Sequence, residues 1–309
     1  MPAPPRPEPP LGVFVGLATL DVVHRVTRLA GRDEKVTAVR QDVAAGGPAA
    51  GAAVAFAALG GRARLVTALG PDAAGAAVRD DLRACGVQVV PAPSHAPTPV
   101  SAVQVLEASG ERTVTSLDAA GSDVPAPPDL EELLDGADVV LLDGHHPRLA
   151  LAAARAVAER RDRGAAPLLL LDAGRWQPVV ADLLPLLDVA VCSADFRAPG
   201  AHDAPATAAV LLAAGVPVVA TTAGPGPVRW WQGGRSGQVA VPAVRAVDTL
   251  GAGDAFHGAC AWALACGAGT QEALAAAAVV AAHRVSSVGP RAWLAHLPPV
   301  PARRGRMPG

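Results

Sequence analysis

The residues best suited to chemistry lie together in one stretch near the C-terminal end, DTLGAGDAF from Asp248 to Phe256. Gly251 and Gly253 permit backbone conformations and close approaches that a Cβ would block, so the N–H groups around them can converge on one point. Apolar residues follow at helical spacing, which places this turn at a helix N-terminus, where phosphate or another oxyanion is favoured. The stretch predicts an anion site formed by Gly251, Ala252 and Gly253.

Asp254 is the acidic residue that ends this turn, and two roles are open to it from the residues alone. A carboxylate in the first turn of a helix can be a cap, which contributes about 1 kcal/mol. Beside an anion site it can instead take the proton of a hydroxyl while the neighbouring amides hold the phosphoryl group that the hydroxyl attacks. As a general base, Asp254 would contribute about a hundredfold to ten-thousandfold in rate.

Composition limits the class of protein. The 309 residues, of which 51% are hydrophobic and 17% charged, suffice for one large domain with a substantial core. A net charge of −2 offers no electrostatic case for binding nucleic acid or a membrane surface. Lys35 is the only lysine and lies outside any G-x-x-x-x-G-K-[ST] loop, which excludes a Walker-type nucleotide site.

The compartment is predicted from cysteine usage and hydropathy. The four cysteines lie in apolar segments without Cys-x-x-Cys spacing, which indicates reduced, buried thiols. No apolar run approaches the roughly 20 residues that span a bilayer. The first ten residues are mostly proline and do not resemble a signal peptide. We therefore expect a cytoplasmic protein.

The candidate residues must be positioned by elements that alternate along the chain. Short apolar runs alternate with helical patterns, which predicts an α/β fold: a central, mostly parallel sheet with helices on both faces. Buried strands are expected at 11–18, 64–67, 87–90, 139–142, 168–171, 189–191 and 216–220, and helices at 72–85, 149–163, 204–214 and 270–285. Ligand-binding groups of such a sheet should collect at the carboxyl ends of its strands.

Two further stretches, at about 22–43 and 97–118, alternate polar and apolar residues, as in VTAVR from Val36 to Arg40. This alternation is typical of half-exposed strands. Because the two stretches are separated in a chain rich in helices, we expect them to form a small sheet outside the main layers. The natural role of that sheet is a lid.

Several polar residues follow the predicted strands. Asp21 follows the first of them and could cap a turn or accept two hydroxyl hydrogen bonds from a sugar. His145 and His146 follow the strand at 139–142. Metal binding, substrate contact and an ordinary loop are all open for this pair, although side chains of adjacent residues rarely point to one ion.

Two motifs, taken in this order, resemble the signatures of the ribokinase-like (PfkB) carbohydrate kinase family. The first is GGPAAG from Gly46 to Gly51, followed by the run LGxxxxLVxxLGxD that ends at Asp72; the second is the DTLGAGDAF stretch. Without the resemblance, a plain turn into a helix is the favoured explanation of Gly46 and Gly47, and close approach to a ligand is the other. With it, residues 11–297 are expected to form one kinase domain, with flexible tails at 1–10 and 298–309.

The resemblance implies ATP-dependent transfer of the γ-phosphoryl group to a hydroxyl of a sugar or sugar derivative, with Mg²⁺ as cofactor and K⁺ as a candidate activator. Asp254 would be the catalytic base, and the amides of Gly251, Ala252 and Gly253 would form the anion hole. The implied substrate contacts are Asp21, Gly46, Gly47, Gly51 and His145. The implied nucleotide contacts are Ser193, Thr222, Gly224, Gly226 and His283. Asp195 would hold Mg²⁺ through a water, and Asp248 and Gly289 a monovalent cation.

This chain departs from the family pattern at two positions. Many members carry an Asn that contacts the substrate where this chain has Gly51. GGPAA without that Asn is similar to the branch that contains sulfofructose kinases, yet the arginine expected there near His145 is absent. Ser193-Ala194-Asp195 stands where the family usually has Asn-x-x-Glu.

Two alternatives to a sugar kinase stay open, and the departures at Gly51 and Ser193 motivate the second of them. A nucleoside kinase of the same family is disfavoured because Phe is scarce and Tyr absent, which limits stacking on a base. A sugar- or nucleotide-binding regulator on the same scaffold would bind without turnover, although Asp254 and its glycines argue against it. The expected partner is a small sugar-like molecule, with no nucleic acid or membrane, and relatives suggest a homodimer through the lid.

Overall fold

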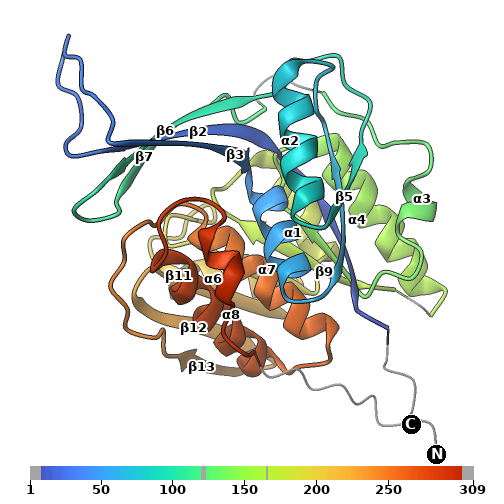
Figure 1. Ribbon diagram of the computed structural model, residues 1–309. Helices are drawn as coiled ribbons and strands as arrows, with labels where there is room; N and C mark the ends of the chain where they lie inside the picture. Colours follow the sequence, from blue (N-terminus) through green and yellow to red (C-terminus); the bar gives the residue numbers. More distant parts are fainter. Residues whose placement is uncertain (1–7, 120–122, 165, 301–309) are drawn as a thin grey trace, which may run out of the picture.

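The computed structural model describes residues 8–119, 123–164 and 166–300, and a nine-stranded sheet organises most of them (Figure 1). The strand order is β13-β12-β11-β10-β9-β8-β1-β4-β5. These strands are β1 (Leu11–Val15), β4 (Arg62–Thr67), β5 (Val87–Pro91), β8 (Val139–Leu142), β9 (Leu168–Ala173), β10 (Val189–Cys192), β11 (Val218–Ala223), β12 (Gly226–Gln232) and β13 (Arg235–Val239). All neighbours from β5 to β11 pair in parallel, which confirms the predicted α/β class.

The central strands are apolar on both faces, as parallel strands between two helical layers must be. β1 and β8 are buried along their whole lengths. Successive side chains of a strand point to opposite faces, so Phe14 and Leu141 enter one core while Val13 and Val140 enter the other.

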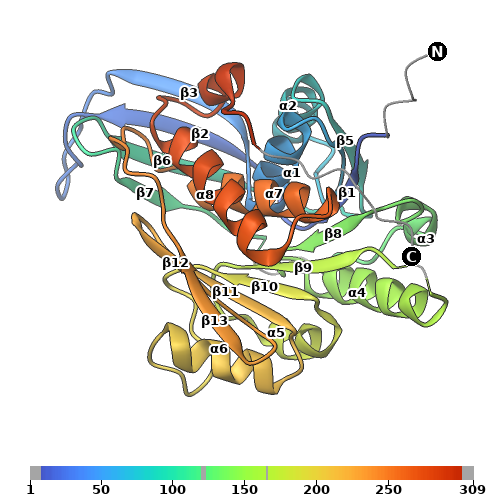
Figure 2. The same ribbon diagram turned by 90° about the horizontal axis from the view of Figure 1, so that it is seen from below.

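Helices cover both faces of this sheet (Figure 2). On one face, α1 (Pro48–Ala58), α7 (Ala252–Ala265) and α8 (Thr270–Val285) pack against one another, with α2 (Ala73–Ala84) beside β5. On the other face lie α3 (Leu130–Leu133), α4 (Pro147–Asp162), α5 (Pro178–Leu183), the 3₁₀ turn η1 (Leu184–Leu186) and α6 (Ala204–Ala213). A last 3₁₀ turn, η2 (Ala292–His296), follows α8. The predicted helices therefore all form, with ends that differ by one or two residues.

A second, four-stranded sheet extends away from the main one (Figure 1). Its order is β3 (Arg40–Gly46), β2 (Thr19–Val26), β6 (Val100–Leu106) and β7 (Arg112–Thr115). We call it the lid sheet. It uses both stretches predicted to form a lid, but residues 36–39 are not a strand. They lie in the β2–β3 connection, where Arg28 pairs with Glu34, so their alternation of polar and apolar residues does not reflect strand pairing.

The hairpin β12–β13, which was not predicted, adds an antiparallel edge to the main sheet. Its strands mix tryptophan with arginine, glutamine and glycine, and neither core-like apolar runs nor regular alternation marks them. Residues 8–10 and 298–300 of the predicted tails are described, and Pro10 is buried with its carbonyl accepting from the Arg62 N–H. The rest of both tails, 1–7 and 301–309, lies outside the described residues.

The positions of the cysteines and the hydropathy of the helices can be compared with the predictions from the sequence. None of the four cysteines, which all lie in the described ranges, forms a disulfide; three are buried and Cys85 is half-buried. Within the described ranges, no helix combines the length and apolar character needed to cross a membrane.

Candidate active site

A cleft of about 460 Å³ lies between the lid sheet and the carboxyl ends of the main strands. From the lid it is lined by Asp21, Ser101, Arg112, Val114 and Ser116; from the strand ends by Asp143, His145, Asp172, Ser193 and Asp195; and from the start of α7 by Gly251, Gly253, Asp254 and His257. This is the edge at which open α/β sheets bind ligands. The structure therefore brings about half of the predicted site residues to this cleft, although they come from distant parts of the sequence.

The anion site predicted at the start of α7 has the expected backbone geometry. Gly251 is the N-cap residue, with φ 71° and ψ 11° in the left-handed region that glycine tolerates. Among the described residues, the N–H groups of Gly251, Gly253 and Asp254 have no acceptor, and that of Ala252 makes only a long 3.4 Å contact with the Thr249 carbonyl. These amides carry the positive end of the α7 dipole and open on the cleft.

Asp254 lies between this anion site and a second cavity of about 50 Å³. Burial raises the pKa of Asp254 to about 7; the negative charge of Asp172 adds to the increase, and His257 and Arg112 oppose it. A carboxyl group with this pKa exchanges its proton near neutral pH. The side chain lines the cleft rather than pointing away from it, as a general base must.

Each of three cleft carboxylates lies against a glycine. A Cβ on Gly46 would lie 2.1 Å from Oδ2 of Asp21, and one on Gly51 would lie 2.6 Å from Oδ2 of Asp254. Gly16 stands in the same relation to Asp143, at 2.2 Å from Oδ1. Gly46 and Gly51 line the small cavity, so at these positions the missing side chains make room for carboxylates.

Gly47 has a different reason to be glycine. It precedes α1 with φ 94°, and a Cβ there would lie 2.4 Å from the Leu17 carbonyl oxygen. The residue lines the cleft. Any larger residue would push the start of α1 away from the loop after β1.

Asp143 and His145 form an ion pair that the sequence did not identify. Asp143 is buried and accepts from the N–H groups of Leu17 and Ala49, which joins the β1 loop to α1. Although burial disfavours its charge, His145 and the Leu17 amide lower the pKa of Asp143. Burial alone would lower the pKa of His145, but Asp143, whose Oδ1 lies 3.3 Å from Nδ1, raises it to about 9. His145 therefore presents a positive charge to the cleft.

His146, the neighbour of His145 in sequence, does not join it. It is 2% exposed and does not line the cleft, and burial lowers its pKa. Among the described residues, no group of three or more His, Cys, Asp or Glu side chains is arranged to hold a metal ion. Of the two histidines, His145 lines the cleft and His146 does not.

Asp172 and His257 are a second pair that sequence reasoning missed. Oδ2 of Asp172 lies 3.2 Å from Nδ1 of His257, which also contacts the Gly253 carbonyl at 2.7 Å. The other ring nitrogen faces the Val191 carbonyl of β10 at 3.2 Å. Burial raises the pKa of Asp172, and His257 only partly offsets this. The imidazole thus fixes the start of α7 to the sheet. Two signals pointed here: Asp172 ends a strand, and His257 follows Asp254 by one helical turn.

The predicted nucleotide residues divide between several places. Ser193 lines both the cleft and an adjoining cavity of about 290 Å³, in which Thr222 also lies. Gly224 and Gly226 are in the β11–β12 turn, next to residues that line this cavity, and Asp195 opens on the main cleft. His283 is elsewhere: its Nε2 contacts the Trp293 carbonyl at 2.9 Å, and it lines neither cavity.

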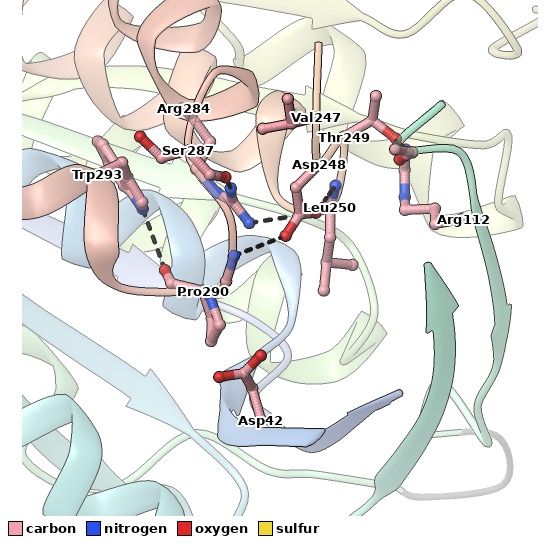
Figure 3. Close-up of polar contacts among 12 residues, drawn as sticks. Asp42, Arg112, Val247, Asp248, Thr249, Leu250, Arg284, Ser287, Pro290 and Trp293 are labelled. Carbon is pink, nitrogen blue, oxygen red and sulfur yellow. Dashed lines mark hydrogen bonds and ion pairs between the residues drawn. The ribbon is translucent and has the colours of Figure 1, made fainter. Parts of the chain in front are cut away.

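Asp248 and Gly289 do meet, as the predicted cation site requires, but through a direct hydrogen bond. Oδ2 of Asp248 accepts from the Gly289 N–H at 3.0 Å, and Oδ1 accepts from the Leu250 N–H at 3.1 Å (Figure 3). The guanidinium of Arg284 lies 3.7 Å from the same Oδ1 (Figure 3). Sequence reasoning did not single out Arg284.

Comparison with known proteins agrees with this arrangement. Residues 11–296 match the model of a family described as pfkB family carbohydrate kinase. A solved Agrobacterium tumefaciens protein provisionally described as a ribokinase is 28% identical, with a TM-score of 0.80 over 93% of this chain and 94% of that one. Arabidopsis thaliana ribokinase complexed with ribose and ATP is 25% identical, with a TM-score of 0.72 over 91% and 94% of the two chains. Escherichia coli phosphofructokinase-2, at 18% identity and a TM-score of 0.70 over 90% and 94%, shares the fold.

Proposed function

Since this chain belongs to the pfkB family of carbohydrate kinases, we propose that it transfers the γ-phosphoryl group of ATP to a hydroxyl of a sugar or sugar derivative bound in the cleft. The observation that carries the proposal is the position of Asp254, a carboxyl group with a pKa of about 7 beside amides that have no acceptor among the described residues.

The acceptor sugar is held from the lid side and from the strand ends. Asp21, which accepts from Thr19 Oγ1 at 2.6 Å, has further acceptor capacity for sugar hydroxyls. Protonated His145 donates from the opposite side. Gly47 brings backbone to the same surface. Gly46 and Gly51 contribute indirectly, by making room for Asp21 and Asp254.

Chemistry takes place at the start of α7. Asp254 accepts the proton of the attacking hydroxyl, and the amides of Gly251, Ala252 and Gly253 stabilise negative charge on the transferring phosphoryl group. Arg112 of β7 lines the same part of the cleft and adds a positive charge from the lid. When the lid covers the bound sugar, it excludes water that would otherwise accept the phosphoryl group.

ATP and Mg²⁺ are the proposed cofactors. Mg²⁺ is usually held by one or two carboxylates together with substrate phosphates and waters. Asp195 is an exposed carboxylate in the cleft next to Ser193, so the residues present fit this ion. Bound Mg²⁺ neutralises charge on the phosphates. Thr222, Gly224 and Gly226 would contact the nucleotide from the adjoining cavity or its rim. No role in binding adenine is proposed for His283, which bonds to Trp293.

The residues present do not fit the potassium ion that the resemblance implied. Both oxygens of Asp248 already accept amide hydrogen bonds, and Arg284 supplies a positive charge at the same carboxylate. K⁺ is therefore not among the proposed cofactors.

The composition of the cleft supports a sugar over a nucleoside. Among the described residues, its lining includes no Phe or Trp on which a base could stack, whereas carboxylates, hydroxyls and His145 suit a polyol. Membership of the sulfofructose kinase branch stays a prediction from motif style alone. The cytoplasmic location stays a prediction from cysteine usage and hydropathy.

The lid sheet also supports a homodimer. Val22, Val43 and Ala102 are paired across β2, β3 and β6 on the face opposite Asp21 and Ser101. Val43 is 52% exposed, and Val100 on the same face is 46% exposed. We propose that a second copy of the chain covers this apolar surface.

The test is ADP release by the purified chain with Mg²⁺, ATP and a panel of sugars, sugar acids and nucleosides. The proposal predicts turnover with at least one sugar or sugar acid and none with nucleosides. Turnover with nucleosides alone would favour the nucleoside kinase. Sugar binding, measured by calorimetry, without ADP release from any panel member would favour a regulator.

A further inference from the structure

Arg284, near the end of α8, is a buried cation that the reaction proposed above does not use. It is 2% exposed. Its Nη1 donates to the Ser287 carbonyl at 3.2 Å and its Nη2 lies 3.7 Å from Oδ1 of Asp248 (Figure 3). Burial lowers the pKa of Arg284, and the negative charges of Asp248 and Asp254 oppose this. A guanidinium stays protonated in proteins, so a full positive charge is fixed inside the molecule here.

This charge lies directly behind the anion site. Nε of Arg284 is 3.8 Å from the place that a Cβ on Gly251 would occupy, and both residues line the small cavity together with Asp254. Asp248, the partner of Arg284, in turn accepts from the Leu250 N–H and so holds the loop that leads into Gly251. Through Asp248, the position of Arg284 is coupled to the position of the catalytic amides.

Several oxygen atoms around this point are already bonded to donors of the protein. The Ser287 carbonyl accepts from Arg284, the Pro290 carbonyl accepts from the Trp293 ring N–H, and the Val247 carbonyl accepts from Arg25. The Val285 carbonyl accepts from the N–H groups of Val247 and Asp248. An alkali-metal ion needs several oxygens that can replace its water shell. Here those oxygens face N–H groups and a guanidinium.

We propose that Arg284 is the resident cation of this site: its guanidinium holds Asp248 and the loop before Gly251 in place of an alkali-metal ion, so that phosphoryl transfer needs no monovalent cation. Arg284 is a positioning residue, since it acts on the anion site through Asp248. The inference rests on the proposed kinase function for its kinetic consequence, but not for its prediction about ion binding.

The first test uses the unaltered protein. Rates of ADP release with an accepted sugar are measured in tetramethylammonium, sodium and potassium chloride at equal ionic strength. We expect the three rates to agree within about twofold, whereas a coupled effector ion typically changes affinity by about fivefold or more. Activation by K⁺ or Na⁺ of about tenfold or more would overturn the proposal.

A second readout does not depend on turnover. Calorimetry measures the melting temperature and the affinity for Mg²⁺ with a non-hydrolysable ATP analogue in the same three salts. We expect no specific effect of K⁺ on either quantity. An ion bound only by the folded protein would raise the melting temperature, and such an increase would contradict the proposal even if no sugar were accepted. Failure of the proposed kinase function would show separately, as no ADP release with any panel member.

Variants test the positioning role. In tetramethylammonium buffer, Arg284→Met should lower kcat by about tenfold or more with little change in sugar KM, because amides that stabilise developing charge lose their alignment. Arg284→Lys keeps the charge and should restore most of kcat.

Arg160→Met is the matched control. Arg160 is also largely buried, and it forms ion pairs with Glu131 and Asp135 on the far helical layer. Its loss should leave kcat unchanged. Full kcat in folded Arg284→Met would refute the role, and if neither Arg284 variant folds, the salt comparison decides.

Discussion

At the scale of single residues, the proposed chemistry depends most on the pKa of Asp254. Burial and Asp172 raise it, and His257 and Arg112 lower it, with a result of about 7. A base must be able to hold the proton it removes, and a carboxylate with an ordinary pKa would do so poorly at neutral pH. Gly51 leaves room for this side chain because it has no Cβ, so one glycine and three charged neighbours tune the base.

The neighbours should shift the pH dependence of activity in opposite directions. For the parent enzyme, kcat/KM should rise with pH and level off above about 7, because Asp254 must be unprotonated in the free enzyme. Asp172→Asn removes a nearby negative charge and should move the midpoint to lower pH. Arg112→Gln removes a positive charge and should move it to higher pH. Asp80→Asn, at an exposed carboxylate of α2, is the control and should leave the midpoint in place. Midpoints that move together, or not at all, would show that Asp254 is not the titrating group.

The structure places Gly251, Gly253 and Asp254 in the cleft at the start of α7, but it gives several other predicted residues different surroundings. The DTLGAGDAF stretch sufficed to predict a helix N-terminus at Gly251, because apolar residues at helical spacing follow its glycines. The roles of Gly46 and Gly51 could not be predicted, since the carboxylates that lie against them, Asp21 and Asp254, are distant in sequence. Arg284 escaped notice for the same reason: helical spacing does not encode its contact with Asp248.

At the scale of elements, the β6–β7 turn couples the lid to the anion site. Gly110, at the tip of the turn, has φ 70°, and its carbonyl accepts from both the N–H and the hydroxyl of Thr249. A Cβ at this position would lie 2.5 Å from the carbonyl carbon of Val247. The lid therefore rests on the chain a few residues before Gly251, and displacement of one displaces the other.

Gly110→Ala should separate the lid from this support. We expect kcat/KM for the sugar to fall between about tenfold and a hundredfold, because small displacements of reacting groups have effects of this size. Hydrolysis of ATP without sugar should increase, because water is less well excluded. Gly136→Ala is a matched control, since Gly136 also has φ 70° but a Cβ there meets nothing within 4 Å. It carries the same backbone strain, about 1 kcal/mol. Equal kinetic effects of the two variants would mean that strain, not contact with Val247, is responsible.

The parallel part of the main sheet could be predicted because its strands are continuous apolar runs between helices. The β12–β13 hairpin could not, because the edge of a sheet tolerates a mixed sequence and only pairing with β11 defines it. In the lid, alternation identified β2 and β6 but extended β3 too far toward its N-terminus, since alternation at 36–39 occurs in a loop.

At the scale of the whole molecule, the two faces of the lid sheet differ in character. The cleft face carries Asp21 and Ser101, while the outer face carries exposed Val43 and Val100. A protein of 30.9 kDa that pairs through this face should have twice that mass by light scattering after size exclusion. Val43→Lys with Val100→Lys should give the monomer mass, because burying two lysines in an apolar interface is costly. Val279→Lys, at a valine of α8 that is 36% exposed, should leave the mass unchanged. A parent protein with the monomer mass would refute the dimer.

The central claim is that Asp254 removes the proton of the sugar hydroxyl, and Asp254→Asn tests it most directly. The substitution keeps the shape of the side chain and removes its basicity. With an accepted sugar at saturating concentration, kcat should fall by about a hundredfold to ten-thousandfold. The variant should melt no lower than the parent at pH values above 7, because a neutral amide avoids the cost of burying a charge. A folded Asp254→Asn enzyme that phosphorylates the sugar as fast as the parent would contradict the claim.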